Sequence, residues 1–298
     1  MQIGLIGLGK MGYNLALNFK HNGHQVLAYD LNKALSEKIR QQGIATVLSV
    51  TDLVLSLPGR KVIWLMVPAG NAVNMILSNL KKHLHEGDII IDAGNSHYKD
   101  SITRAKELEE MGVYFLDCGT CGGVQTVADG LSLTIGGNKD AYDYCEPIFK
   151  AVSKVGAYMH CGNSGNGHFV KMVHNGIEYG MLQAIAEGME LLTKHNHLNV
   201  ADVAKVWNNG SLIESKLLGF TKNVLEQNVN LENLKAVANH SSEGKWPAEA
   251  ALELGVPAPI ITLSLLMRYR SQQDDSFAVK LISALRGEVG GHAVEKKD

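Results

Sequence analysis

This chain has little of what marks several classes of protein. Its four cysteines are too few for a disulfide framework in 298 residues. Its 28 basic residues are balanced by 30 acidic ones, so the basic surface of a nucleic-acid-binding protein is missing. No apolar run approaches the ~20 residues that span a bilayer, and the N-terminus lacks the basic segment and cleavage site of a signal peptide. We therefore expect a cytoplasmic protein without nucleic-acid or membrane partners.

A metal site is also not expected. Cys118 and Cys121 form a C-x-x-C, but no second cysteine pair and no histidines at ligand spacing accompany it. The thioredoxin-like context that would make such a pair a redox centre is missing as well. We interpret this C-x-x-C as incidental.

Residues 1–162 alternate short β-branched runs with helical periodicity. This alternation is typical of a parallel sheet wrapped by helices, and it predicts an α/β domain with a doubly wound, Rossmann-type sheet. The expected strands are Gln2–Ile6, Gln25–Tyr29, Lys61–Met66, Asp88–Asp92, Val113–Asp117, Leu131–Ile135 and Val155–His160. The expected helices are Lys10–Asn22, Lys33–Gln42, Asn71–Lys82, Lys99–Glu110 and Lys139–Val152.

Strand signals vanish after the Gly- and Asn-rich segment Cys161–Gly167, which breaks regular structure. Helical periodicity then continues with short interruptions, so residues 163–298 are predicted to form an all-α domain that carries the substrate site and the dimer contacts. The Gly-rich tail Gly287–Asp298 is expected to be irregular. The expected helices are Gly167–Lys194, Val200–Asn208, Ile213–Glu226, Trp246–Leu254, Pro259–Ser271 and Ser276–Leu285.

A glycine-rich turn between the first expected strand and helix predicts a dinucleotide site. Gly7 permits a tight turn, Gly9 lets the backbone approach a pyrophosphate, and Gly12 lets the helix pack closely on the sheet. The helix N-terminus would offer its N–H groups to that pyrophosphate. The predicted cofactor residues here are Gly7, Leu8, Gly9, Lys10, Met11, Gly12 and Asp30.

Asp30 ends the next expected strand, where a carboxylate can bind a ribose 2′-hydroxyl. This acid distinguishes a cofactor site from the alternative, a purely structural glycine turn. A carboxylate repels a 2′-phosphate, and no arginine follows Asp30, so NAD is favoured and NADP is the weaker alternative.

One expected helix carries Lys171, His174, Asn175 and Glu178 within an arc of roughly 100°. The polar stripe is predicted to line a cavity. Oxidation of an alcohol by a nicotinamide cofactor requires a base, for which Lys171 is the candidate, and Glu178 could return a proton to carbon. The alternative is a surface ion pair of these two residues. The other face is apolar, with Phe169, Val170, Met172, Val173, Ile177 and Met181.

The segment Gly167–Tyr179, GHFVKMVHNGIEY, resembles the signature of the decarboxylating 6-phosphogluconate dehydrogenases. The short length is similar to that of the family's short bacterial form, which is often NAD-linked. Further matches are Ile90–Ser96, Gly122–Gly123, Gly244–Trp246, Leu254–Pro257, and Arg286 followed by His292.

The resemblance implies a role for each matching residue. Lys171 would be the base that takes the 3-hydroxyl proton, and Glu178 the acid that protonates C1 of the enediol. Val67 and Ala69 would lie near the nicotinamide, and Asn95 would touch both cofactor and substrate. The substrate carboxylate and hydroxyls would be held by Asn95, Cys121, Gly122, Gly123, His174 and Asn175, and its phosphate by Tyr179, Arg268, Arg286 and His292.

Arg286 and His292 would reach the site from a second subunit, so at least a homodimer, or a homotetramer, is expected. The substrate would be a phosphorylated sugar acid. Three departures from the family pattern concern this site, and one of them is the unusual segment Val124–Thr126. Cys121 replaces the usual serine and is a weaker donor, and Ser241–Lys245 lacks the lysine and threonine that long-chain members place on the phosphate.

Two other functions fit parts of the pattern. A non-decarboxylating β-hydroxyacid dehydrogenase, of the 3-hydroxyisobutyrate type, shares the positions of Lys171 and Asn175 but needs no phosphate cluster. A non-enzymatic NAD-binding regulator would have no use for the Lys171 and Glu178 pair.

Overall fold

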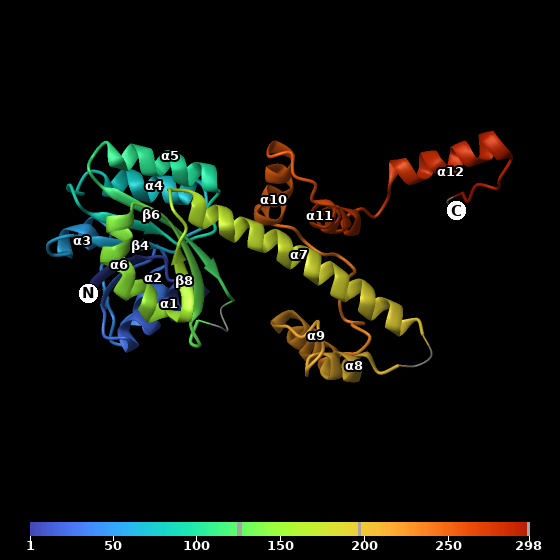
Figure 1. Ribbon diagram of the computed structural model, residues 1–298, viewed down its shortest axis with the longest axis horizontal. Helices are drawn as coiled ribbons and strands as arrows, with labels where there is room; N and C mark the ends of the chain where they lie inside the picture. Colours follow the sequence, from blue (N-terminus) through green and yellow to red (C-terminus); the bar gives the residue numbers. More distant parts are fainter. Residues whose placement is uncertain (124–126, 196–197, 297–298) are drawn as a thin grey trace. The chain divides into compact units, whose positions relative to one another are not determined.

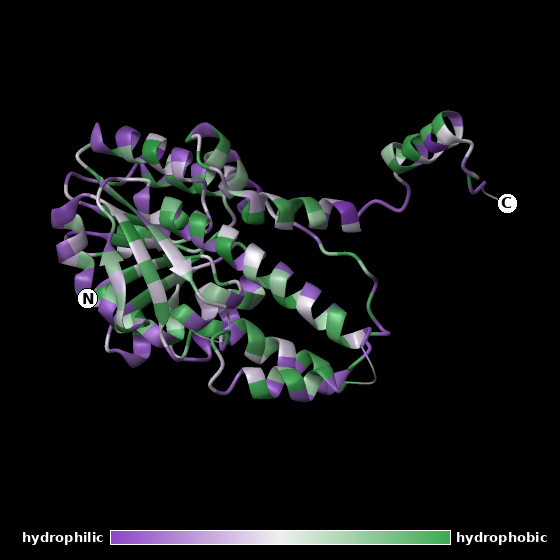
Figure 2. Ribbon diagram, turned by 45° about the vertical axis from the view of Figure 1, so that its right-hand side comes forward, coloured by the Kyte–Doolittle hydropathy of each residue, from purple (hydrophilic) through white to green (hydrophobic). Residues whose placement is uncertain are grey.

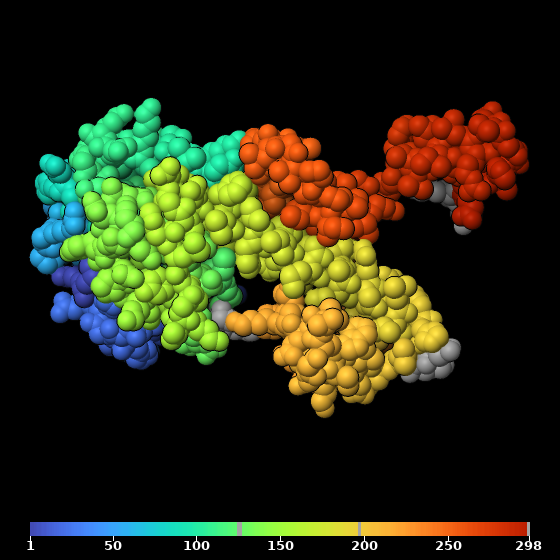
Figure 3. All heavy atoms as spheres, in the orientation of Figure 1, coloured from blue at the N-terminus to red at the C-terminus, as the bar shows by residue number. Residues whose placement is uncertain are grey.

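The computed structural model describes residues 1–123, 127–195 and 198–296. The chain forms two compact units, Met1–Asn175 and Gly176–Asp298, and the division falls within helix α7 (Asn166–Thr193). In the space-filling view the first unit, coloured blue to yellow-green, is a closely packed body (Figure 3).

The first unit contains an eight-stranded sheet in the order β3-β2-β1-β4-β5-β6-β7-β8. This confirms the predicted doubly wound α/β fold. The strands are β1 (Gln2–Ile6), β2 (Gln25–Tyr29), β3 (Ala45–Thr46), β4 (Val62–Leu65), β5 (Ile89–Asp92), β6 (Tyr114–Cys121), β7 (Leu131–Gly137) and β8 (Ser153–His160).

The expectation of an all-parallel sheet is wrong at one pairing, because β6 and β7 run antiparallel while the other neighbours are parallel. A parallel pairing needs a crossover of about a dozen residues or more. Only residues 122–130 separate these two strands, so the chain reverses direction there.

Helices cover both faces of the sheet, with α4 and α5 on one side and α1 and α6 on the other (Figure 1). Phe19 and Phe149 pack on one face, and Leu53, Leu77 and Leu108 on the other. The apolar colouring of the strands shows the core between these layers (Figure 2). The helices are α1 (Lys10–His21), α2 (Lys33–Arg40), α3 (Val50–Ser56), α4 (Asn71–Leu80), α5 (Tyr98–Glu109) and α6 (Lys139–Val152).

The sequence prediction missed β3 and α3. A two-residue strand is too short to show a periodic pattern. Helix α3 had a readable start, because Ser49 Oγ accepts the Asp52 backbone N–H at 2.9 Å as an N-cap.

In the part of the chain that the structure describes, the second unit holds the rest of α7 and five further helices. Its core is small, formed by Met189, Val200, Ala201, Ala204, Leu218 and Leu225. No helix among the described residues is both long and apolar enough to cross a membrane. The helices are α8 (Val200–Trp207), α9 (Lys216–Gln227), α10 (Ser242–Glu253), α11 (Pro259–Ser271) and α12 (Phe277–Gly290).

Three predicted boundaries in this unit are wrong. Helix α10 begins at Ser242, four residues before the predicted Trp246. Helix α9 begins three residues after the predicted Ile213, because Ser215 Oγ caps it by accepting the Leu218 N–H at 3.1 Å. Helix α12 continues through the predicted irregular start of the tail and ends at Gly290, and the next residue, Gly291, caps it in the left-handed conformation with φ +64°.

Candidate active site

The glycine turn lies after β1, where the strand order reverses between β2 and β4. Ligands of open α/β sheets bind at such a switch point, at the carboxyl ends of the strands. A Cβ on Gly7, whose φ is +101°, would lie 2.3 Å from the Met66 carbonyl oxygen, and a Cβ on Gly12 would lie 2.0 Å from the Gly7 carbonyl oxygen. Gly9 instead faces open space, with nothing within 4 Å of an added Cβ. The fold therefore requires Gly7 and Gly12, and the open side of Gly9 leaves room for a pyrophosphate on the backbone.

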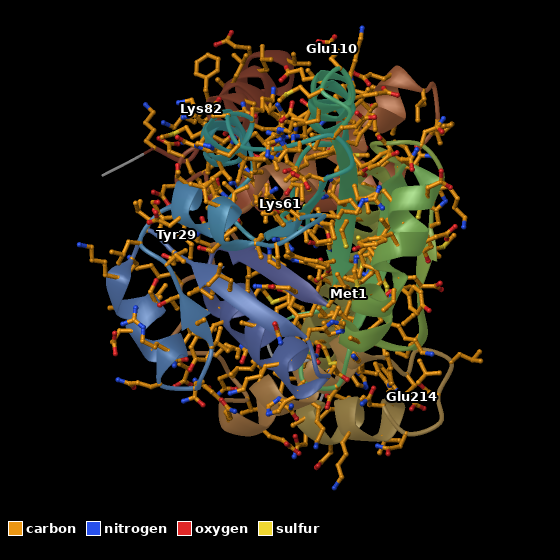
Figure 4. The ribbon with its side chains drawn as sticks, turned by 90° about the vertical axis from the view of Figure 1, so that its left-hand side faces the viewer. Met1, Tyr29, Lys61, Lys82, Glu110 and Glu214 are labelled. Atoms are coloured by element: carbon orange, nitrogen blue, oxygen red, sulfur yellow. The ribbon has the colours of Figure 1, made fainter. Side chains whose placement is uncertain are left out.

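Asp30 follows the end of β2, whose last residue, Tyr29, is labelled in Figure 4. Its Oδ2 accepts the Leu8 backbone N–H at 2.6 Å, and its Oδ1 accepts the Asn32 N–H at 2.7 Å. The carboxylate thus holds the glycine turn in shape, and each oxygen keeps a further lone pair that can accept a ribose hydroxyl. The next residue, Leu31, is 87% exposed and uncharged, so this position offers no cation to a 2′-phosphate. The residues present fit NAD.

Three further predicted cofactor residues lie on neighbouring loops. Val67 and Ala69 follow β4, Asn95 follows β5, and β4 and β5 are paired. These loops are in close contact, because a Cβ on Gly94 would lie 2.6 Å from the Val67 carbonyl oxygen. Ala69 and Asn95 are exposed and thus accessible to a ligand.

Lys171 is a buried amine in the first unit, with 9% of its surface exposed. A Cβ on Gly119 of β6 would lie 2.5 Å from the Lys171 Cβ, so only a glycine lets the helix come this close to the strand. Asn175, one turn later, is 7% exposed, whereas His174 is exposed.

The predicted apolar face of α7 is largely not buried. Val170, Ile177 and Met181 are 40%, 52% and 42% exposed, although Met172 is buried. A helix that buries Lys171 and exposes these side chains does not follow the usual amphipathic pattern. Such exposed apolar residues are typical of a surface that another chain covers.

The start of α7 is anchored by Asp117, a fully buried residue of β6. Its carboxylate accepts the backbone N–H groups of Gly165 at 2.6 Å and His168 at 2.8 Å. A negative charge at a helix N-terminus is favourable, so the acid satisfies free N–H groups and the helix dipole together. The imidazole Nδ1 of His168 lies 2.7 Å from Ser101 Oγ of α5, which ties the same turn to a second element.

Strand β6 ends at the half-buried Cys121, and the exposed Gly122 and Gly123 follow it. Gly122 has φ +142°, a conformation that other residues rarely adopt. The predicted departure at Val124–Thr126 lies outside the described residues.

Cys118 is fully buried, and burial raises the pKa of its thiol well above the usual value. Residues three apart on a strand point to opposite faces, so the C-x-x-C does not form one site. Among the described residues, no cluster of three or more His, Cys, Asp or Glu could hold a metal.

Tyr179 and Arg268 form a stacked pair within the second unit. The Arg268 guanidinium carbon lies 3.6 Å from the Tyr179 ring centroid, and Nη1 donates to the Asn239 carbonyl at 3.0 Å. The Tyr179 oxygen accepts the Ser241 N–H at 3.4 Å, at the start of α10. A Cβ on Gly244 would lie 2.2 Å from the Tyr179 ring, so glycine is needed there. This pair presents a cation beside a helix N-terminus, an arrangement suited to an anion.

The structure also shows what surrounds Lys245 and the two predicted tail residues. Lys245 Nζ lies 2.8 Å from Glu249 Oε1, and this contact raises the pKa of Lys245. Arg286 and His292 line one hollow, together with Ile282, Leu285, Val289 and Gly290. The structure therefore brings the two predicted tail residues together.

The predicted site residues fall into two groups. The cofactor residues, the β6 loop, Lys171, His174 and Asn175 belong to the first unit. Glu178, Tyr179, Arg268, Arg286 and His292 belong to the second, and Glu178 follows Lys171 by two turns of the same helix.

Sequence reasoning missed Asp92, Arg104 and Asp117. The two acids had a signal, because polar residues at the carboxyl ends of adjacent parallel strands converge at one edge. Arg104 had none, since its position on α5 resembles that of any surface arginine.

The fold and the glycine turn define a dinucleotide-binding α/β protein with a helical second unit. Residues 2–164 match the NAD binding domain of 6-phosphogluconate dehydrogenase, and residues 167–297 match the 6-phosphogluconate dehydrogenase C-terminal domain. This chain belongs to the 6-phosphogluconate dehydrogenase family.

Individual relatives agree with this assignment. YqeC of Bacillus subtilis (strain 168) is 43% identical over 298 residues, which cover both chains completely. The NAD(+)-dependent, decarboxylating 6-phosphogluconate dehydrogenase of Haloferax volcanii is 42% identical over 301 residues, again over all of both chains. The Plasmodium falciparum 6-phosphogluconate dehydrogenase, solved apo, with NADP+ and with 6-phosphogluconate, superposes with a TM-score of 0.83 at 30% identity. This chain is covered completely and spans 66% of the Plasmodium chain.

Proposed function

We propose that this protein oxidises 6-phosphogluconate to ribulose 5-phosphate and CO₂ with reduction of NAD+. The observation that carries the proposal is the buried Lys171, held against Gly119 in the same unit as a complete dinucleotide turn. The names of the Haloferax and Plasmodium relatives support the substrate and the decarboxylation. Residues 1–162 form the dinucleotide-binding domain in this proposal, and residues 163–298 the substrate and dimerisation domain.

Bound NAD+ supplies the hydride acceptor for C3 of the substrate. Lys171 Nζ takes the proton of the 3-hydroxyl as C3 becomes a carbonyl. This carbonyl is β to the carboxylate, so it accepts the electron pair of the C1–C2 bond when CO₂ leaves. Protonated Lys171 then stabilises the negative charge on the carbonyl oxygen, which is the task of a preorganised cation. Lys171 gives its proton to this oxygen, which forms the enediol. Glu178 then protonates the carbon that had carried the carboxylate, C1 of the product, while Lys171 takes back the hydroxyl proton and the carbonyl forms again.

The residues around Lys171 orient the substrate in this proposal. Asn175 is buried one turn beyond Lys171, so its amide is held in place. Cys121 offers a thiol, a weaker donor than the hydroxyl of serine, and the glycine amides beside it compensate. The substrate carboxylate and hydroxyls are assigned to Asn95, Cys121, Gly122, Gly123, His174 and Asn175.

The substrate phosphate is assigned to Tyr179 and Arg268, joined by Arg286 and His292 of a second copy. Helix α12 supports this exchange, because none of its residues is buried, and Phe277 and Val289 are 78% and 88% exposed. An apolar helix of this kind is stable only when another chain covers it. We therefore propose a homodimer, which can associate further into a tetramer.

Mixed dimers test this arrangement. We expect Lys171→Met and Arg286→Ala to be inactive alone, and their mixture, unfolded and refolded together, to regain about a quarter of the sites by random pairing of the two chains. No recovery would show that Arg286 serves its own chain.

NAD is proposed as the preferred coenzyme because Asp30 occupies the position of a 2′-phosphate partner, and NADP remains the weaker substrate. The cytoplasm is the proposed location. The four cysteines are thiols that form no disulfide with one another, as is usual in a reducing compartment.

A substrate panel tests the proposal against its rivals. We expect turnover of 6-phosphogluconate with NAD+ and none of 3-hydroxyisobutyrate, which lacks the phosphate that Arg268 would bind. Preference for 3-hydroxyisobutyrate would support the non-decarboxylating dehydrogenase, and NAD+ binding without any turnover would support the regulator.

A further inference from the structure

Arg104 of α5 is a buried cation in the first unit, with 5% of its side chain exposed. Its Nη1 lies 3.3 Å from Asp92 Oδ2 and 3.2 Å from Ser96 Oγ. Asp92 ends β5 and is fully buried, and its Oδ2 also accepts the Ser96 hydroxyl at 2.7 Å. One edge of the guanidinium therefore fixes the loop after β5.

The remaining donors of Arg104 fix the loop after β4. Its Nη2 donates to the Gly70 carbonyl at 3.2 Å, and its Nε donates to Asn74 Oδ1 at 3.0 Å. Gly70 has φ +82° and caps the start of α4, so its carbonyl is held in an unusual direction. Nη2 also lies 3.7 Å from Asp100 Oδ2, a half-exposed neighbour on the same helix.

The two loops form a continuous backbone surface with the glycine turn. The contacts of Gly94 with the Val67 carbonyl and of Gly7 with the Met66 carbonyl leave no room for a Cβ at either glycine. Asp30 follows β2, so the adenosine half of a dinucleotide would lie on the β2 side of the glycine turn. The nicotinamide half would then lie on the other side of the turn, over the ends of β4 and β5. Arg104 lies beneath that half and not beneath the adenosine half.

We propose that Arg104 is a positioning residue that holds the loops 66–70 and 93–97 in register for the nicotinamide half of the cofactor. The inference rests on the proposed function. Only a guanidinium has donors in a planar fork that can reach two loops at once, whereas a lysine has one nitrogen. A buried ion pair costs desolvation and adds little stability, so its contribution here is to fix loop geometry.

The test compares binding of NAD+ with binding of ADP-ribose, which lacks the nicotinamide ring. In Arg104→Lys we expect kcat to fall on the order of 10–100-fold, because small misplacements of reacting groups are costly. The Kd of NAD+, measured by calorimetry, should rise, while that of ADP-ribose stays within about twofold of wild type. Asn74→Ala removes a single partner of Arg104 at an exposed position. It should also raise the ratio of the Kd of NAD+ to the Kd of ADP-ribose, but by less than Arg104→Lys does.

Lys81→Met is the matched control. Lys81 Nζ lies 2.6 Å from Glu107 Oε2 and joins the C-cap of α4 to the last turn of α5. It should leave kcat and both affinities unchanged.

Three results would overturn the inference: an unchanged kcat in Arg104→Lys, equal weakening of NAD+ and ADP-ribose, or an equal effect of Lys81→Met. Wild-type enzyme that binds NAD+ but turns over no 6-phosphogluconate would instead refute the proposed function. The two binding constants would still test the role of Arg104.

Discussion

Asp117 accepts the backbone N–H of His168 at 2.8 Å, one helical turn before Lys171. The position of the proposed base therefore depends on an acid of the sheet that touches neither substrate nor cofactor in this account. Thr134 Oγ1 adds a second tie by donating to the Gly167 carbonyl at 2.9 Å.

Replacement of Asp117 by Asn tests this dependence. The amide keeps one acceptor oxygen but loses the other and the negative charge, so one buried N–H group loses its partner. We expect the free energy of unfolding to fall by about 1–3 kcal/mol in denaturant titrations. We also expect kcat to fall while the Kd of NAD+ is unchanged, because the glycine turn lies on other strands. A normal kcat would show that Lys171 does not depend on this anchor.

The glycines of the turn should separate into two kinds. Gly9→Ala adds a methyl in open space, so the free energy of unfolding should stay within about 1 kcal/mol of wild type while NAD+ affinity falls at least tenfold. Gly12→Ala forces a methyl against the Gly7 carbonyl and should lower stability by about 1–3 kcal/mol or more. Calorimetric binding and thermal unfolding measure both effects. Unchanged NAD+ affinity in Gly9→Ala would place the pyrophosphate elsewhere.

Coenzyme preference should follow Asp30 and its exposed neighbour Leu31. The double change Asp30→Asn and Leu31→Arg removes the repulsion of a 2′-phosphate and adds a guanidinium for it. We expect the ratio of kcat/KM for NADP+ over NAD+ to rise. Because Asp30 also holds the Leu8 N–H, some loss of stability should accompany the change. An unchanged ratio would contradict the assigned role of Asp30.

Glu178→Gln keeps the size and polarity of the side chain but removes its ability to give a proton. If Glu178 is the acid, kcat should fall on the order of 10²–10⁴-fold. The Kd of NAD+ should not change, since the glycine turn is untouched. Normal turnover of the variant would exclude Glu178 from this role.

The sheet could be predicted because its central strands contain continuous apolar runs, such as Val62–Leu65 and Ile89–Ile91. The direction of β7 and the short helix α3 were not predicted. The evidence for them lies in a loop length and in a single N-cap residue, and neither produces a periodic sequence pattern. The cofactor turn was readable because its glycines have local geometric reasons.

The residues that hold the site in position could be predicted less well than the site residues themselves. Arg104 acts through contacts with residues far apart in sequence, and no spacing in the chain reveals it. Asp117 could have been found, because it ends an expected strand beside the strand that ends at Asp92. The exposure of the apolar face of α7 was not predicted either, because apolar character alone does not show whether a side chain is buried.

The central claim is that removal of a hydroxyl proton by Lys171 leads to loss of the substrate carboxylate. Turnover of 6-phosphogluconate labelled with ¹³C at C1 tests it most directly, with NADH followed by absorbance and labelled CO₂ by mass spectrometry. The account predicts one ¹³CO₂ for each NADH in wild type and neither product in Lys171→Met. NADH formed with the label retained in an oxidised sugar acid, or an active Lys171→Met, would contradict it.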